Sequence, residues 1–245
     1  APFIARIDAD DLCLPERFER QLAFLQARPE IAVVGSFIQK FSDDAATLPP
    51  VTRFPTEPPE IAAALLFRNP LAHPAVMLRK SALDAAALRY DESFRRSQDY
   101  ALWVQCALRG LPMANLPEVL LKYRVHPGQI SSLHLAEQQQ TVTRAQAQLI
   151  QHGLHIQLNQ RTADLHHRLA FSKWEPTTDF IAAAGLWLLT LADANENHKS
   201  FPRDPFLRTL TGRYISLHRF AKQNHLPPPP IPETLTPFIH PGALG

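Results

Sequence analysis

The chain has little glycine, little cysteine and no long hydrophobic run. Only 8 of its 245 residues are glycine, and it contains neither a GxGxxG motif nor a phosphate-binding P-loop. Its two cysteines, Cys13 and Cys106, indicate buried thiols in a reducing compartment rather than a disulfide framework. The longest apolar run, Phe180 to Ala192, is too short for a bilayer and predicts a buried helix. We therefore expect no transmembrane helix. A net charge of +2 gives no electrostatic footprint of nucleic-acid binding, so we also expect no nucleic-acid partner.

Three carboxylates follow a short apolar segment near the N-terminus. Phe3 to Ile7 is predicted to be a strand, and Asp8, Asp10 and Asp11 come at its C-terminal end, where α/β proteins bind ligands. Two acids at i and i+2 of an extended segment share a face and can approach one hard cation, such as magnesium or manganese. A solvated acidic turn is the alternative interpretation.

The remaining pattern predicts an α/β region followed by helices. Strands are expected over residues 31–37, 73–79 and 119–126, and helices over residues 15–28, 59–68, 97–110, 135–152, 179–192 and 204–224. The first helix places Phe18, Leu22 and Leu25 on one apolar face, and Ser81 with Asp84 is typical of a capping box. We therefore predict an α/β domain over residues 1–132 and a helical region over residues 133–245, with a Pro-rich tail.

Three further polar residues lie on otherwise apolar elements. Asp99 falls in the first turn of a helix that Ser97 can cap, where the helix dipole stabilises its charge, so it could act as a base or be an ordinary helix-terminal acid. His126 ends a strand and is either a ligand or an exposed histidine. His73 either lines the acceptor side of a site or caps its strand against Asn69. Trp103 lies on the apolar stripe of its helix and is predicted to be in the core rather than a sugar platform.

Four blocks of sequence, taken in order, resemble the family 2 glycosyltransferases, which have the Rossmann-like GT-A fold. They are IDADDLCLPERFERQLAFLQARPEIAVVGS, NPLAHPAVMLRK, YDESFRRSQDYALWVQCALRG and LPEVLLKYRVHPGQIS. The resemblance runs from about residue 3 to 132 and leaves out the C-terminal helices. The QxxRW pattern of processive polysaccharide synthases is absent, which counts against a polymerase of that type.

The resemblance implies roles for individual residues. Asp8-Ala9-Asp10 resembles the DxD motif that holds Mn²⁺ or Mg²⁺ on the diphosphate of a nucleotide-sugar, with Asp10 as the direct ligand and Asp8 facing the nucleotide or the metal's waters. Asp11 is grouped with them on the donor side. His126 resembles the histidine that reaches back to the metal or the diphosphate.

The catalytic base is implied in the same way. Asp99 resembles the acid of the family's "ED" position, although Gln98 stands where many relatives have Glu. A carboxylate base and a Lewis acid on the leaving diphosphate are the two groups that glycosyl transfer requires. The implied activity is inverting, metal-dependent transfer of a sugar to a hydroxyl of a glycan, lipid-linked or other acceptor. This activity belongs to cell-surface polysaccharide assembly. The protein would act in the cytoplasm or at the inner face of the membrane, where it could associate peripherally with the membrane.

Two other interpretations remain open. In the family, several nucleotide-binding strands precede the DxD strand, whereas here that strand begins at residue 3. We therefore expect the 245 residues to represent the second half of a GT-A domain and not to transfer sugar alone. A truncated, inactive binding or scaffolding module is the alternative function. A metal phosphohydrolase is disfavoured because no nucleophilic Asp in a closed Rossmann unit is visible.

Overall fold

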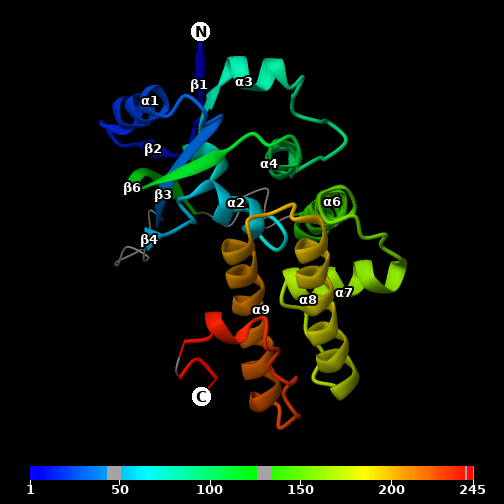
Figure 1. Ribbon diagram of the computed structural model, residues 1–245. Coiled ribbons are helices and arrows are strands. Elements are labelled where there is room, and N and C mark those ends of the chain that lie inside the picture. Colours follow the sequence, from blue (N-terminus) through cyan, green and yellow to red (C-terminus); the bar gives the residue numbers. More distant parts are fainter. Residues whose placement is uncertain (43–50, 126–133, 241, 245) are drawn as a thin grey trace. The chain divides into compact units, whose positions relative to one another are not determined.

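The computed structural model describes residues 1–42, 51–125, 134–240 and 242–244. They form two compact units. The first comprises Ala1–Leu65 with Asn69–Ala145, and the second comprises Leu66–Arg68 with Gln146–Gly245. The first unit is α/β and the second is helical (Figure 1), which confirms the predicted fold class.

The main segment of the second compact unit starts at Gln146, within the helical region that follows residue 133. The helix α6 (Leu135–Gln148) starts inside the first unit. Arg96 Nε donates to Glu137 Oε2 over 2.6 Å, and Ser97 Oγ lies 2.6 Å from Thr141 Oγ1. These contacts hold the first turns of α6 against the segment that precedes α4.

A six-stranded mixed sheet organises the first unit. Its order is β1-β5-β3-β6-β2, with β4 paired to β3 off this path. Among the described strands, β3 and β6 pair in parallel and the other pairs are antiparallel. The strands are β1 (Phe3–Ala5), β2 (Leu12–Cys13), β3 (Val33–Phe41), β4 (Val51–Thr52), β5 (Met77–Arg79) and β6 (Met113–Arg124). The strand β1 is therefore an edge strand, and Ile4 is 45% exposed on it.

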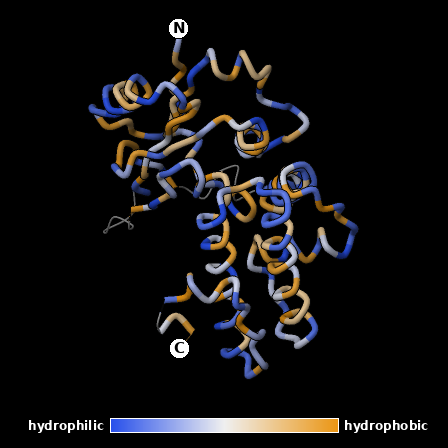
Figure 2. Tube along the Cα trace, in the orientation of Figure 1, coloured by the Kyte–Doolittle hydropathy of each residue, from blue (hydrophilic) through white to orange (hydrophobic). Residues whose placement is uncertain are grey.

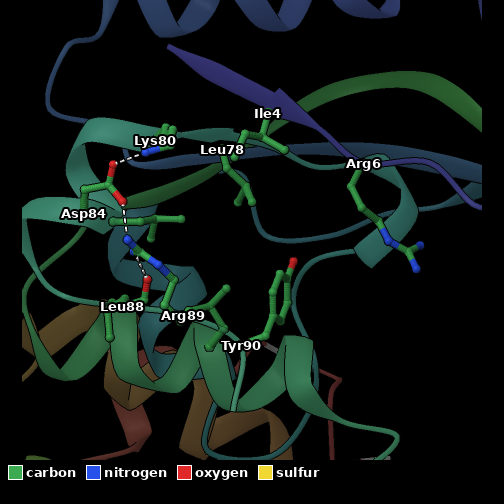
Figure 3. Close-up of a pocket in the computed structure, with 10 residues that line it drawn as sticks. Ile4, Arg6, Leu78, Lys80, Asp84, Leu88, Arg89 and Tyr90 are labelled. Carbon is green, nitrogen blue, oxygen red and sulfur yellow. Dashed lines mark hydrogen bonds and ion pairs between the residues drawn. The ribbon is translucent and has the colours of Figure 1, made fainter. Parts of the chain in front are cut away.

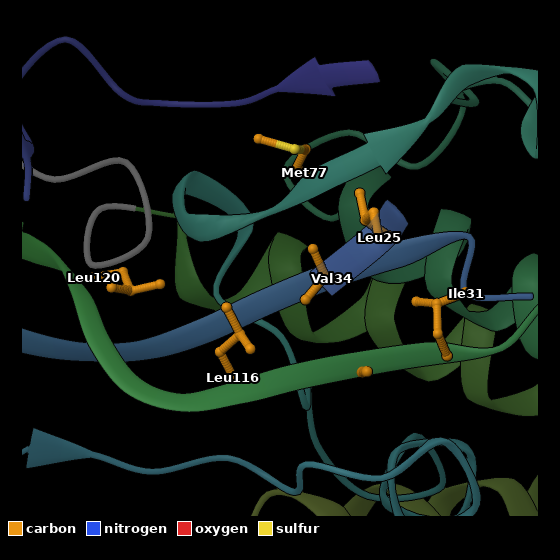
Figure 4. Packing of buried hydrophobic residues seen from close by; sticks show 7 residues of the cluster. Leu25, Ile31, Val34, Met77, Leu116 and Leu120 are labelled. Atoms are coloured by element: carbon orange, nitrogen blue, oxygen red, sulfur yellow. The ribbon is translucent and has the colours of Figure 1, made fainter. Parts of the chain in front are cut away.

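Helices cover both faces of this sheet. They are α1 (Arg17–Ala27), α2 (Pro58–Ala64), the 3-10 turn η1 (His73–Ala75), α3 (Lys80–Ala85) and α4 (Gln98–Leu108). On one face, Leu25 of α1 packs in a cluster with Val34 and Met77 (Figure 4). Leu78 points to the other face, since successive strand residues alternate, and there it lines a cavity with Leu102 of α4.

The apolar face predicted for the first helix is buried only at Leu25, and a polar pair is buried beside it. Arg17, Gln21 and Leu25 are buried, whereas Phe18 is 49% and Leu22 is 36% exposed. The polar pair is buried because its side chains find main-chain carbonyl partners in neighbouring segments. Apolar periodicity alone could not detect those partners.

Two further local predictions are corrected. The capping box of Ser81 and Asp84 does not form, because α3 begins at Lys80 and the Asp84 carboxylate pairs with Lys80 and Arg89. The strand expected over residues 73–79 is divided into η1 and β5, since Pro74 lies in the first positions of a 3-10 turn. Cys13 and Cys106 are both free thiols; Cys106 is buried as predicted, whereas Cys13 is only partly buried.

The second unit is built from helices with an apolar interior. They are the π-turn η2 (Leu149–Gly153), α7 (Gln160–Ala170), α8 (Thr178–His198), α9 (Arg203–Gln223) and the 3-10 turn η3 (Thr236–Phe238). The sequence did not predict α7, whose residues are mostly polar and whose start is fixed by a capping box between Asn159 and Thr162. Hydrophilic and hydrophobic residues are mixed along α8 and α9 (Figure 2). Over the described ranges, no helix has both the length and the hydropathy that a membrane span needs.

Candidate active site

The acidic turn, Asp8 to Asp11, crosses one end of the sheet. It leaves β1 at one edge and enters β2, which pairs with β6 at the opposite edge. One carboxylate oxygen from each of Asp8, Asp10 and Asp11 lies within 4.8 Å of the others. The structure thus brings together the three acids that the sequence grouped on spacing alone.

Two arginines tie the acidic turn to its surroundings. Arg6 Nη1 lies 2.6 Å from Asp8 Oδ2. From the end of β6, the Arg124 backbone N–H donates to Asp11 Oδ1 over 2.9 Å, and its Nε donates to the Asp10 carbonyl over 2.9 Å. His126, the predicted second ligand, follows two residues later and lies outside the described residues.

The Asp11 carboxyl provides the test of whether a cation fits here. It is only 7% exposed, and its Oδ2 has no hydrogen-bond partner among the described residues. Burial raises the pKa of Asp11, the Arg124 N–H lowers it, and the charges of Asp10 and Asp8 raise it again. A divalent cation would give the buried oxygen a partner and offset the repulsion between three carboxylates. Three carboxylates are the hard oxygen donors that Mg²⁺ and Mn²⁺ take, so the residues present fit such an ion.

A buried polar pair on α1 holds the segments around the acidic turn. Arg17 is fully buried; its Nη2 donates to the Arg6 carbonyl over 2.6 Å and its Nε to Gln21 Oε1 over 3.1 Å. Gln21 Nε2 donates to the Ala75 carbonyl over 2.7 Å, within the turn that begins at His73. The sequence analysis missed this pair, although its i, i+4 spacing on one helix face was a usable signal.

Asp99 lies in the first turn of α4, as the sequence predicts. Asn69 Nδ2 donates to Asp99 Oδ2 over 2.9 Å. Ser97 occupies the N-cap position, but its side chain makes no cap hydrogen bond and lies against Thr141 instead. Trp103, further along α4, is fully buried, which confirms that it belongs to the core.

His73 lies within electrostatic range of both acidic groups. Its Nε2 is 3.0 Å from the Tyr90 hydroxyl, whereas the Asn69 side chain pairs with Asp99 and with the Leu71 N–H. Burial lowers the pKa of His73, and the charge of Asp99, followed by that of Asp8, acts in the raising direction. The imidazole is therefore close enough to Asp99 and to Asp8 for both charges to act on it.

Tyr90 is a site residue that the sequence analysis missed. Burial and the charge of Asp99 raise the pKa of Tyr90 to about 12, so its hydroxyl keeps its proton. The ring of Tyr90 lies 5.7 Å from that of His73, centroid to centroid. Only an aromatic side chain in a polar connection marked this position, and that pattern carries no motif.

A cavity of about 230 Å³ opens beside Tyr90 (Figure 3). Its wall is apolar and its rim is polar. The wall residues are Ile4, Leu78, Leu83, Leu88 and Leu102, and the rim residues are Arg6, Lys80, Asp84, Arg89 and Tyr90. Asp84 pairs with Lys80 and Arg89, so this part of the rim is internally neutralised.

The curated relatives that the chain matches are named glycosyltransferases. The chain is 34% identical over 121 residues to the amylovoran biosynthesis glycosyltransferase AmsE of Erwinia amylovora, covering 49% of this chain and 44% of the relative. It is 35% identical over 129 residues to an uncharacterized glycosyltransferase of Haemophilus influenzae, covering 53% and 47%. A third relative, the O-antigen biosynthesis glycosyltransferase WbnJ of Escherichia coli, is 31% identical over 125 residues, covering 50% and 47%. The chain spans about half the length of these relatives.

No family model matches the chain. Among solved structures, S. aureus TarS, residues 1–349, in complex with UDP-GlcNAc aligns with a TM-score of 0.45 and 15% identity. The alignment covers 92% of this chain and 66% of TarS.

Proposed function

We propose that the chain carries the metal side and the acceptor side of an inverting, metal-dependent glycosyltransferase of family 2, with the GT-A fold. The donor is a nucleotide-sugar, and the acceptor is a hydroxyl of a glycan, lipid-linked or similar molecule in polysaccharide assembly at the cytoplasmic face of the cell membrane. The observation that carries the proposal is the gathering of three carboxylates at the end of the sheet, with one oxygen of Asp11 buried and unpartnered among the described residues. The names of the curated relatives support the same activity.

The proposed donor side uses the acidic turn. Asp10, with Asp8 and Asp11 beside it, would hold Mn²⁺ or Mg²⁺, which supplies a Lewis acid for the leaving diphosphate. The resemblance adds His126, which lies outside the described residues, as a further ligand. Arg6 and Arg124 keep the turn in place through Asp8, the Asp10 carbonyl and Asp11. These contacts fix the backbone and two of the three carboxylates of the turn.

The proposed acceptor side uses Asp99. Its carboxylate takes the proton of the acceptor hydroxyl as that oxygen bonds to the anomeric carbon of the sugar. The bond from that carbon to the diphosphate breaks at the same time, and its electron pair leaves with the nucleotide, so the configuration inverts. His73 and Tyr90, which contact each other and feel the charge of Asp99, would orient the acceptor.

Two measurements test the proposal. The first is Mn²⁺ binding, followed by electron paramagnetic resonance, to the 245-residue chain and to Asp10→Asn, with the exposed acid Glu19→Gln on α1 as the control. We expect Asp10→Asn to weaken binding about tenfold or more and Glu19→Gln to leave it unchanged. The second is sugar transfer by the full-length protein, in which Asp99→Asn should lower kcat by roughly 10²- to 10⁴-fold and change the donor KM little.

Two outcomes would contradict the proposal. Equal Mn²⁺ binding by Asp10→Asn and by the parent chain would remove the metal site. Near-normal turnover of Asp99→Asn would remove the base. A full-length protein that binds Mn²⁺ but transfers no sugar would instead favour the non-catalytic binding or scaffolding module.

A further inference from the structure

The orientation of the Asn69 side chain is fixed by two hydrogen bonds. Its Oδ1 accepts from the Leu71 backbone N–H over 3.2 Å. Since the carbonyl oxygen of the amide is used in this turn, the NH₂ group must point the other way. It points at Asp99, and Nδ2 donates to Oδ2 over 2.9 Å.

The turn that carries Asn69 is anchored in the core of the first unit. Leu71 is 2% exposed, and the carbonyl of Pro70 accepts from Asn115 Nδ2 over 3.0 Å. Asn115 is itself 2% exposed, and a Cβ added at Gly35 would lie 2.2 Å from its Oδ1. Glycine at position 35 therefore leaves the space that Asn115 needs. The position of Asn69 follows from buried contacts rather than from a surface loop.

The pair of Asn69 and Asp99 differs from an ion pair. Within the described ranges, no lysine or arginine forms a salt bridge with Asp99, and Oδ1 accepts no hydrogen bond from another residue. A neutral amide donor fixes the plane of the carboxylate and leaves its charge and one oxygen for another partner. A cation at the same place would compete with the acceptor hydroxyl for that carboxylate.

We infer that Asn69 is the positioning residue of Asp99, holding Oδ2 so that Oδ1 faces the acceptor hydroxyl. The inference rests on the proposed function, because it assumes that Asp99 is the base. Asn69 thereby joins the residues of the proposed site. Its amide acts on turnover through Asp99 and touches neither the donor nor the reacting atoms.

Two substitutions at position 69 separate this role from a structural one. Asn69→Ser keeps an oxygen that can accept from the Leu71 N–H but loses the donor that reaches Asp99. Asn69→Asp also keeps the acceptor and replaces the donor by a second negative charge. In the full-length protein we expect kcat to fall about 10- to 100-fold in Asn69→Ser and further in Asn69→Asp, with the KM of both substrates changed less than about twofold. Asn224→Ser, at an exposed helix end in the second unit, is the control and should leave kcat unchanged.

A double-mutant cycle and a spectroscopic signal complete the test. In the Asp99→Asn background, Asn69→Ser should change the residual kcat by less than about twofold, because its effect runs through Asp99. In the 245-residue chain, the side-chain amide signal of Asn69 in a ¹⁵N spectrum should shift in Asp99→Ala and not in Asn224→Ser. This second readout needs no activity.

The outcomes distinguish the two levels of the argument. If Asp99→Asn abolishes turnover while Asn69→Ser leaves kcat unchanged, or if the two losses multiply fully, the positioning role is wrong and the proposed function stands. If Asp99→Asn keeps its turnover, the base assignment falls and the positioning role falls with it. An Asn69 signal that does not respond to Asp99→Ala overturns the hydrogen bond itself.

Discussion

The buried polar side chains of the two units hold different kinds of segment in place. In the first unit, the buried Arg17, Gln21 and Asn115 donate to main-chain carbonyls of loops distant in sequence, and those loops carry the acidic turn, His73 and Asn69. In the second unit, His166 and Asn195 make hydrogen bonds that hold helix ends and short segments in an apolar interior. Within the described residues, the metal-capable group of three acids lies in the first unit.

This difference predicts where stability and chemistry separate. Burying like charges and an unpartnered carboxylate oxygen costs folding free energy, and such features are kept where a ligand uses them. The second unit also buries unpartnered polar atoms, on Gln146, Trp174, Thr211 and His218, but within the described residues no group of carboxylates gathers there. Its interior should therefore respond to substitution mainly through packing. Substitutions in the second unit should therefore change stability alone, and substitutions in the acidic turn should change ion binding more than they weaken the fold.

The largest expected effect is on the packing of the second unit. Leu188 of α8 is fully buried, so Leu188→Ala should lower the free energy of unfolding by about 3 kcal/mol, through lost burial and the cavity left behind. Urea denaturation followed by circular dichroism measures this loss. Mn²⁺ binding by the folded variant should not change.

Leu186, on the same helix, is the matched control because it is 67% exposed. Leu186→Ala should lower stability by less than about 0.5 kcal/mol. Equal losses in the two variants, or weaker Mn²⁺ binding in Leu188→Ala, would break the proposed separation between the units.

A second prediction concerns the pH dependence of stability in the second unit. His166 Nε2 lies 2.7 Å from the Leu66 carbonyl and its Nδ1 accepts from Trp187 Nε1 over 3.2 Å, so the buried ring is held neutral. Burial lowers the pKa of His166 from 6.5 to about 4. Below pH 6.5 the unfolded chain binds a proton that the folded chain refuses, so stability falls as the pH falls. The loss contributed by His166 should reach roughly 3 kcal/mol by pH 4.

Unfolding measured by urea between pH 7.5 and about 4.5 tests this sign, as the linkage between proton binding and folding requires. His166→Gln should be less stable than the parent at neutral pH and should lose much of the acid dependence. His152→Gln, at an exposed position of the same unit, should keep it. A parent chain whose stability does not decline on acidification, or declines equally in His166→Gln, would contradict a neutral buried imidazole.

The fold class followed from the sequence because local patterns determine it. The β-branched segment after Pro29 and the apolar stripe around Trp103 became β3 and α4. The failures lie where tertiary partners override periodicity. The helix α7 is polar along most of its length, so it shows no apolar stripe. In α1, Arg17 is buried because its side chain donates to the main-chain carbonyl of Arg6. Contacts of this kind join segments far apart in the sequence, so a local window of sequence does not reveal them.

Part of the candidate site could likewise be predicted from the sequence, namely the part whose residues are close together along the chain. Asp8, Asp10 and Asp11 are adjacent in sequence, so their spacing already places them on one turn. Asn69 and Asp99 are thirty residues apart, and Tyr90 lies seventeen residues from His73. Only the fold brings such residues together, and an asparagine before a proline is usually a simple turn residue. The sequence pointed to Asp99 as the candidate base but gave no sign of its hydrogen bond with Asn69.

The smallest expected effect is the most direct test of the comparison. Asp11→Asn keeps the oxygen that accepts from the Arg124 N–H and removes a buried charge that lies among like charges. In the presence of EDTA, the variant should be more stable than the parent by about 1 kcal/mol, because a desolvated carboxylate with an unpartnered oxygen is replaced by a neutral amide. Its affinity for Mn²⁺ should fall at the same time.

The control is Asp193→Asn, at an exposed acid on α8, which should change neither quantity. Opposite signs for stability and ion binding in one substitution are what a functional acidic turn requires. A destabilised Asp11→Asn that still binds Mn²⁺ normally would mean that the carboxylate serves the fold, and the first unit would then differ from the second only in its architecture.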